Sequence, residues 1–143
     1  MIVCAILGNQ GTCHNSELYD TIDEILKKDT KFIFYTCSDS GFEIECERAI
    51  MAAKHRYPES DIRLVPVLPF SLRQMVCSSD CDEFRTPRRI YDSICDWMSN
   101  SRYRWMVKQA DYVLSYVFLN RGKVYKATKY ARRKGKTVFN FYK

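Results

Sequence analysis

The segment from Lys31 to Phe70 constrains the fold more than any other part of the chain, because it has the pattern of a strand, a turn, a helix and a second strand. The run Phe32–Tyr35 is apolar and aromatic, as in a strand that is buried on both faces. Small polar residues then form a turn, and the following helix is expected to end at Tyr57-Pro58. The second strand is Ile62–Leu68. Strands joined by a crossover helix lie parallel, so this segment predicts a parallel sheet.

Three further apolar runs predict the other strands of the sheet: Ile2–Leu7, Tyr112–Phe118 and Thr137–Phe141. Helices are expected between the strands, and most have a recognisable buried stripe. The expected stripes are Leu18, Ile22, Ile25 and Leu26; Ile44, Ala49, Ala52 and Ala53; and Val124, Ala127, Thr128 and Ala131, with Gly135 as a C-cap. The alternation of strands and helices predicts the α/β class, a three-layer Rossmann-like sandwich with a mainly parallel sheet in one domain, residues 1–143.

The segment between the third and fourth strands is harder to interpret. Residues 71–85 are polar and have no clear period, which indicates a loop over the ligand edge. Thr86-Pro87 has the pattern of a helix start, and Ser99-Asn100-Ser101 is expected to interrupt the helical pattern. A second short helix is then expected from Arg102 to Ala110.

Charge is distributed unevenly along the chain. Asp111 is the single acidic residue among the basic residues from Arg102 to Lys143, whereas the preceding part is net acidic, and the whole chain carries +6. A basic C-terminal third favours an anionic partner such as a nucleotide, a nucleic acid or an acidic protein. The alternative is that these residues form the solvated face of one helix.

The seven cysteines suggest a reducing environment. No apolar run approaches the roughly 20 residues that span a bilayer, and we expect no export signal, so the protein is predicted to be cytoplasmic with reduced thiols and no membrane partner. Cys77 and Cys81 form one C-x3-C pair without a matching second pair. One such pair is a weak zinc signal, so we expect neither a metal nor a cofactor.

Four segments are candidates for a ligand site, because ligands of parallel sheets bind outside the carboxyl ends of the strands. Three of them follow predicted strands, and Arg102 is expected to begin a helix whose N-terminus points to the same edge. The candidate ligand-binding residues are Gly8, Asn9, Gln10, Cys37, Ser38, Asp39, Gly41, Glu43, Arg102, Gly122 and Lys123. In this interpretation Ser38 and the backbone near Gly41 donate to phosphate, and Glu43 accepts from a ribose hydroxyl. The alternative is an ordinary strand-to-helix turn with an N-cap at Asp39 or Ser40.

Four stretches of the chain together resemble the SLOG superfamily of Rossmann-like nucleotide-binding domains, in particular its uncharacterised YpsA-like branch. The stretches are GFE at 41–43, YPESDIRLVPVLPF at 57–70, RYRWMVKQADYVLSYV at 102–117 and RGKVYKATKYARRKGKTVFNF at 121–141. The resemblance covers almost the whole chain and implies a nucleotide-binding Rossmannoid domain.

The chain departs from the family pattern at the ligand edge. Cys37 and Ser38 replace paired glycines, Lys123 and Val124 follow Gly122 in place of a second glycine and threonine, and Gly8-Asn9-Gln10 replaces a GHR-like loop. The PGGxGTxxE motif of the related phosphoribohydrolases is absent from the sequence.

These observations favour a protein that binds a nucleotide or nucleotide-derived small molecule as a sensor or sequestering module. No intact catalytic motif is found, which favours a binding protein over an enzyme. Three alternatives stay open: a nucleotide N-glycosidic hydrolase with Glu43 as its acid or base, a nucleic-acid-binding protein that uses the basic C-terminal third, and a degenerate interaction scaffold. Association into homo-oligomers is also left open.

Overall fold

The sheet has five parallel strands in the order β3-β2-β1-β4-β5. The structure, a computed structural model, describes residues 1–8, 16–37, 41–67 and 95–142, and for residues 95–101 it describes the backbone alone. The strands are β1 (Ile2–Gly8), β2 (Lys31–Thr36), β3 (Asp61–Pro66), β4 (Tyr112–Tyr116) and β5 (Thr137–Asn140). Their order and direction confirm the predicted α/β class and its Rossmann-like sheet.

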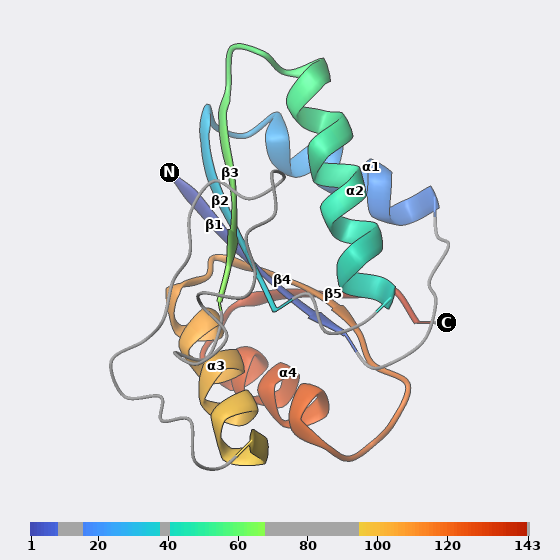
Figure 1. Ribbon diagram of the computed structural model, residues 1–143, viewed down its shortest axis with the longest axis vertical. Coiled ribbons are helices and arrows are strands. Elements are labelled where there is room, and N and C mark those ends of the chain that lie inside the picture. Colours follow the sequence, from blue (N-terminus) through green and yellow to red (C-terminus); the bar gives the residue numbers. More distant parts are fainter. Residues whose placement is uncertain (9–15, 38–40, 68–94, 143) are drawn as a thin grey trace.

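Two helices cover each face of the sheet (Figure 1). α1 (Ser16–Leu26) and α2 (Gly41–Arg56) pack on the first face, over β1, β2 and β3. α3 (Cys95–Gln109) and α4 (Lys123–Arg133) lie side by side on the second face. The predicted three layers are therefore present.

Alternate residues of each strand supply the two cores. In β1, Cys4 and Ile6 face α1 and α2, whereas Ala5 and Leu7 face α3 and α4. All four side chains are fully buried, which explains why β1 is an uninterrupted apolar run rather than an alternating one. The predicted stripes of α1 and α4 are also buried, because their spacing matches the helical period.

The predicted stripe of α2 is partly wrong. Ile44 is 43% exposed and Ala52 is also exposed, whereas Phe42, Glu43 and Cys46 are buried. The buried face therefore begins at Phe42 and continues through Cys46, Ala49, Ile50 and Ala53. It includes a carboxylate and a thiol, so hydrophobicity alone did not identify it.

The predicted break at Ser99-Asn100-Ser101 is also wrong, because α3 continues through it. The helix start expected at Thr86-Pro87 lies outside the described residues, as does the loop at 71–85. At the other boundaries the differences are small: β3 ends at Pro66, and β4 ends at Tyr116 rather than at Phe118.

The end of α4 has the predicted glycine cap. Gly135 has a φ of 76°, its N–H donates to the Arg132 carbonyl (3.1 Å), and the Lys136 N–H donates to the Ala131 carbonyl (3.0 Å). These two bonds form a Schellman motif, which satisfies carbonyl groups that the helix end leaves without intrahelical partners.

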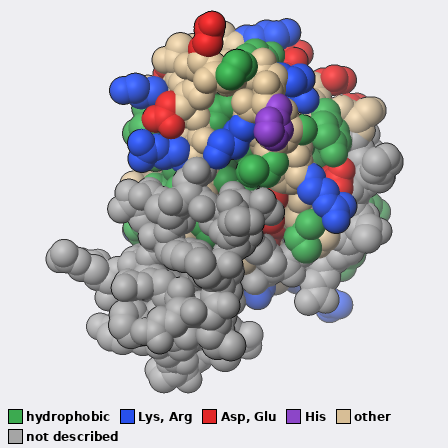
Figure 2. Space-filling model, turned by 45° about the horizontal axis from the view of Figure 1, so that its top comes forward, with side chains coloured by type: hydrophobic (Ala, Val, Ile, Leu, Met, Phe, Trp, Pro, Cys, Tyr) green, Lys and Arg blue, Asp and Glu red, His purple; other side chains and the backbone are tan. Residues whose placement is uncertain are grey.

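Charged side chains of both signs lie on the surface, and several of them are paired. On the face seen in Figure 2, basic and acidic side chains are interspersed. Arg48 pairs with Glu45, Arg56 with Asp23, and Arg63 with Asp61.

No described helix combines the length and the hydropathy that a membrane span requires.

Candidate ligand site at the carboxyl edge of the sheet

The strand order creates a switch point between β1 and β4. After β1 the chain continues into α1 on the first face, and after β4 it continues into α4 on the second face. Gly8, the last residue of β1, is in register with Tyr116, the last residue of β4. In open parallel sheets, ligands bind outside the carboxyl ends of the strands at such a switch point.

Three of the predicted segments follow the adjacent strands β2, β1 and β4, so the structure brings their starts to one edge. Gly8 is buried at the end of β1, and the neighbouring Asn9 and Gln10 lie outside the described residues.

The residues that end β2 point into the protein. Cys37 is buried, with its Sγ 3.5 Å from the Sδ of Met106 in α3. The Thr36 hydroxyl donates to Glu47 Oε1 of α2 at 3.0 Å. The side chain of Cys37 therefore belongs to the core between the sheet and the helices α3 and α4. A ligand at this edge could contact only the backbone of Cys37. Ser38 and Asp39 lie outside the described residues.

Gly41 and Glu43 belong to the first turn of α2. Gly41 is its first residue and is half-buried, whereas the Glu43 side chain is fully buried. A carboxylate in the first turn interacts favourably with the positive end of the helix dipole. Between them, Phe42 stacks on Tyr116 with ring centroids 5.7 Å apart, which holds the start of α2 against the end of β4.

The position predicted for Arg102 is wrong in one respect. Arg102 lies in the interior of α3, which begins at Cys95, so its own N–H groups are not at a helix N-terminus. Its side chain is 5% exposed, and Nη1 donates to the Val67 carbonyl at 3.2 Å. The guanidinium therefore ties α3 to the chain that leaves β3, and a role in phosphate binding stays a prediction.

Gly122 and Lys123 form the start of α4. Gly122 is the N-cap, with φ 94° and ψ 178°, a region essentially confined to glycine. Within the described residues no side chain caps this helix start, and no acidic residue lies in its first turn. Lys123 is exposed, and its Nζ lies 5.9 Å from the ring centroid of Tyr103. Tyr103 adjoins Arg102, so α3 and the start of α4 meet here.

Asn140 is a polar residue of this edge that sequence reasoning missed. Its Oδ1 accepts from the Val117 N–H (3.0 Å), and its Nδ2 donates to the Val117 carbonyl (3.2 Å). These bonds hold the chain leaving β4 against β5, and so anchor the segment that leads to Gly122. The signal in the sequence is one amide between the apolar residues Phe139 and Phe141.

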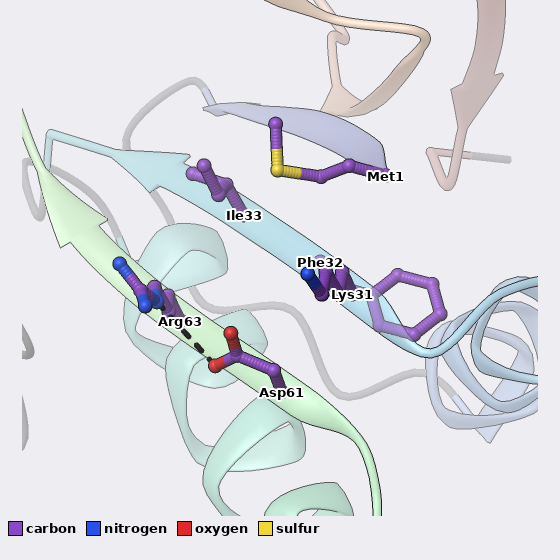
Figure 3. A pocket seen from close by; sticks show the side chains of 6 residues that line it. All are labelled: Met1, Lys31, Phe32, Ile33, Asp61 and Arg63. Atoms are coloured by element: carbon purple, nitrogen blue, oxygen red, sulfur yellow. Dashed lines mark hydrogen bonds and ion pairs between the residues drawn. The ribbon is translucent and has the colours of Figure 1, made fainter.

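A hollow lies at the opposite, amino-terminal edge of the sheet (Figure 3). It encloses about 420 Å³, part of it open to solvent. Lys31 and Asp61 begin β2 and β3 there, and Arg63 Nε lies 3.4 Å from Asp61 Oδ1. Because this hollow lies at the starts of the strands, it is not part of the candidate site at their carboxyl ends.

The described cysteines Cys4, Cys37 and Cys46 lie buried in the two cores as thiols. Burial, together with the negative charge of Asp111, raises the pKa of Cys4 far above its ordinary value, so this thiol stays protonated. Within the described parts of the chain, no three His, Cys, Asp or Glu side chains are grouped to hold a metal. Cys77 and Cys81 lie outside them.

Comparison of the sequence with models of known protein families and with curated proteins finds no match. A function can therefore be inferred only from the sheet topology and from the side chains at its carboxyl edge.

Proposed function

We propose that the protein binds a nucleotide or nucleotide-derived small molecule at the carboxyl edge of its sheet and acts as a sensor or sequestering module. The observation that carries the proposal is the uncapped start of α4 beside the switch point between β1 and β4. The resemblance of the chain to the SLOG superfamily supports the same class of ligand.

The start of α4 suits a phosphate group. Gly122 has no side chain that could accept from the first N–H groups of this helix, and the positive end of the helix dipole favours an anion. Gly122 keeps the approach bare, since a Cβ placed there would meet no atom within 4 Å. Lys123 adds an exposed positive charge at the first helical position.

The start of α2 would hold the sugar end of the ligand. Gly41 begins this helix, and the stack of Phe42 on Tyr116 joins it to the end of β4. α2 and α4 thus begin at the same edge of the sheet but on opposite faces of it. A molecule with a phosphate at one end and a less polar group at the other would bind between the two helix starts.

Recognition fits the site better than turnover. Glu43, the candidate acid or base of a hydrolase, is fully buried in the first turn of α2, whereas a catalytic carboxyl group must reach the reacting atoms. Loss of turnover in a Glu43→Gln variant would favour the enzyme instead.

The buried thiols suit a reducing compartment, and we propose the cytoplasm.

Native mass spectrometry of the protein purified from cells tests the proposal. We expect a co-purifying nucleotide, whose affinity is then measured by calorimetry. Lys123→Gln should weaken binding roughly 10- to 100-fold if the ammonium makes one charge-assisted hydrogen bond to phosphate. Lys126→Gln, on the exposed face of the same helix, is the matched control and should bind as the parent does.

Gly41→Leu provides a second test, because a bulky side chain at the start of α2 blocks the approach of a ligand. We expect loss of binding with an unchanged circular dichroism spectrum. If Lys123→Gln and Gly41→Leu both bind the co-purified molecule as the parent does, the site is elsewhere. If no nucleotide co-purifies and none binds, the interaction scaffold is the better interpretation.

A further inference from the structure

The exposed face of α4 is uniformly basic. The buried stripe of this helix is Val124, Ala127, Thr128 and Ala131. Lys126, Lys129 and Arg133 follow one another at spacings of three and four residues on the opposite side, and all three are exposed. They form one row along the outer surface of the helix.

The basic surface continues onto α3. The guanidinium of Arg104 lies 5.7 Å from the ring centroid of Tyr130 in α4, and Arg133 and Lys134 lie at the same distance from that ring. Lys108 is exposed one turn beyond Arg104. We call this surface the basic face; it consists of Arg104, Lys108, Lys126, Lys129, Arg133 and Lys134.

No acidic side chain neutralises the basic face within the described residues. None of its six cations forms an ion pair there, whereas Arg48, Arg56 and Arg63 are each paired with a carboxylate. Three cations around Tyr130 repel one another, and the ring offsets only part of that repulsion. Clustered, unpaired charge of one sign complements a polyanion.

We propose that the basic face binds the phosphate backbone of double-stranded nucleic acid without reading its sequence. The 11 residues of α4 span about 16 Å, over which a duplex presents roughly nine negative charges. Tyr125 and Tyr130 are half-buried, and cations lie over their rings, so they do not offer the open platforms that stack the bases of single strands.

This surface is separate from the proposed nucleotide site. The row on α4 faces outward, away from the sheet, whereas the nucleotide site lies at the carboxyl edge. A variant of the row therefore tests nucleic-acid binding without touching Gly41, Gly122 or Lys123.

The test is the fluorescence anisotropy of a labelled duplex DNA of random sequence, titrated with the full chain at several salt concentrations. If about four phosphates are neutralised, the slope of log K against log salt is about −3.6. Affinity should then fall about 100-fold between about 50 and about 200 mM salt. A single strand of the same length should bind more weakly than the duplex.

The triple variant Lys126→Gln, Lys129→Gln, Arg133→Gln should lose at least about tenfold in affinity at low salt and have a slope near −1. The matched control is Lys27→Gln, Lys31→Gln, Arg48→Gln, which removes the same charge from exposed positions elsewhere and should bind as the parent does. Glutamine keeps good helix propensity, and circular dichroism checks that both variants fold.

Four results would each overturn the proposal: no salt-sensitive binding, equal loss in both triple variants, tighter binding of the single strand than of the duplex, or binding to vesicles with anionic lipids but not to duplex. The last result would make the basic face a membrane-binding surface.

Discussion

The two faces of the sheet are packed with different kinds of side chain. Among the described residues, the first core, under α1 and α2, contains four buried phenylalanines and no valine. The described part of the second core, under α3 and α4, contains five valines and four alanines and no phenylalanine. The first face is therefore packed mainly with phenylalanine rings, whereas the second combines two buried tyrosines with small side chains where α4 lies on the sheet.

The same two sides also differ outside the core. Tyr19 and Arg56 connect α1 and α2 through Glu45 and Asp23. Between α3 and α4 the described polar contacts are cations over rings, as with Lys123 over Tyr103. On the first side charges are thus paired with carboxylates, whereas on the second side cations lie over aromatic rings.

The largest expected effect comes from removing a ring of the first core. Phe42 is fully buried and stacks on Tyr116 and Phe141, so Phe42→Ala should lower the free energy of unfolding by about 3–5 kcal/mol, measured by urea denaturation. Ile44→Ala is the control on the same helix, since Ile44 is 43% exposed, and it should change stability by less than about 1 kcal/mol. Similar losses in both variants would contradict the assignment of the buried face.

A change in the opposite direction tests the second core. Ala131 is fully buried where α4 packs, so Ala131→Leu should cost about 1–3 kcal/mol by overpacking. Lys129→Leu places the same side chain on the exposed face of α4 and should stay within about 0.5 kcal/mol of the parent. If Ala131→Leu is as stable as the parent, the second core is not closely packed around this small side chain.

The smallest effect concerns the contact between α1 and α2. The hydrogen bond from Tyr19 to Glu45 (2.6 Å), with a contribution from burial, raises the pKa of Tyr19. Its stabilisation is therefore complete below the ordinary tyrosine pKa of about 10 and is lost as the pH rises through the higher folded-state value. Tyr19→Phe should cost about 1 kcal/mol at neutral pH.

The pH dependence distinguishes this bond from simple packing. The difference in unfolding free energy between the parent and Tyr19→Phe should shrink at alkaline pH, as followed by urea titration. If this difference in unfolding free energy stays constant over the whole pH range, the ionisation of the Tyr19 hydroxyl does not affect stability.

Much of the fold could be predicted from the sequence, because buried parallel strands are short apolar runs between turn residues. Phe32–Tyr35 and Thr137–Phe141 fall within about one residue of the observed strands at each end. α3 was harder, because serine and asparagine have low helix propensity and yet lie inside this helix. Tertiary packing of Tyr103, Met106 and Val107 on the sheet overrides that local preference.

The site was less predictable than the fold. That the segments after β1, β2 and β4 open at one edge of the sheet followed from parallel topology alone. A turn was expected over residues 119–123, and α4 begins at Lys123, the last residue of that turn. The orientation of individual side chains did not follow, since sequence gave no reason for Cys37 to face Met106 or for Arg102 to lie inside a helix. Such orientations depend on contacts between residues that are far apart in the chain.

The pairing of β1 with β4 also determines the order in which the molecule can assemble. The Val3 N–H donates to the carboxylate of Asp111, 108 positions further along the chain. β1, β2 and β3 are close together in sequence and can pair without the rest of the chain, but one edge of β1 stays unpaired until β4 is present. Contacts between residues so far apart in sequence raise the contact order, which slows folding in general. The edge between β1 and β4 cannot form before β4 has been synthesised.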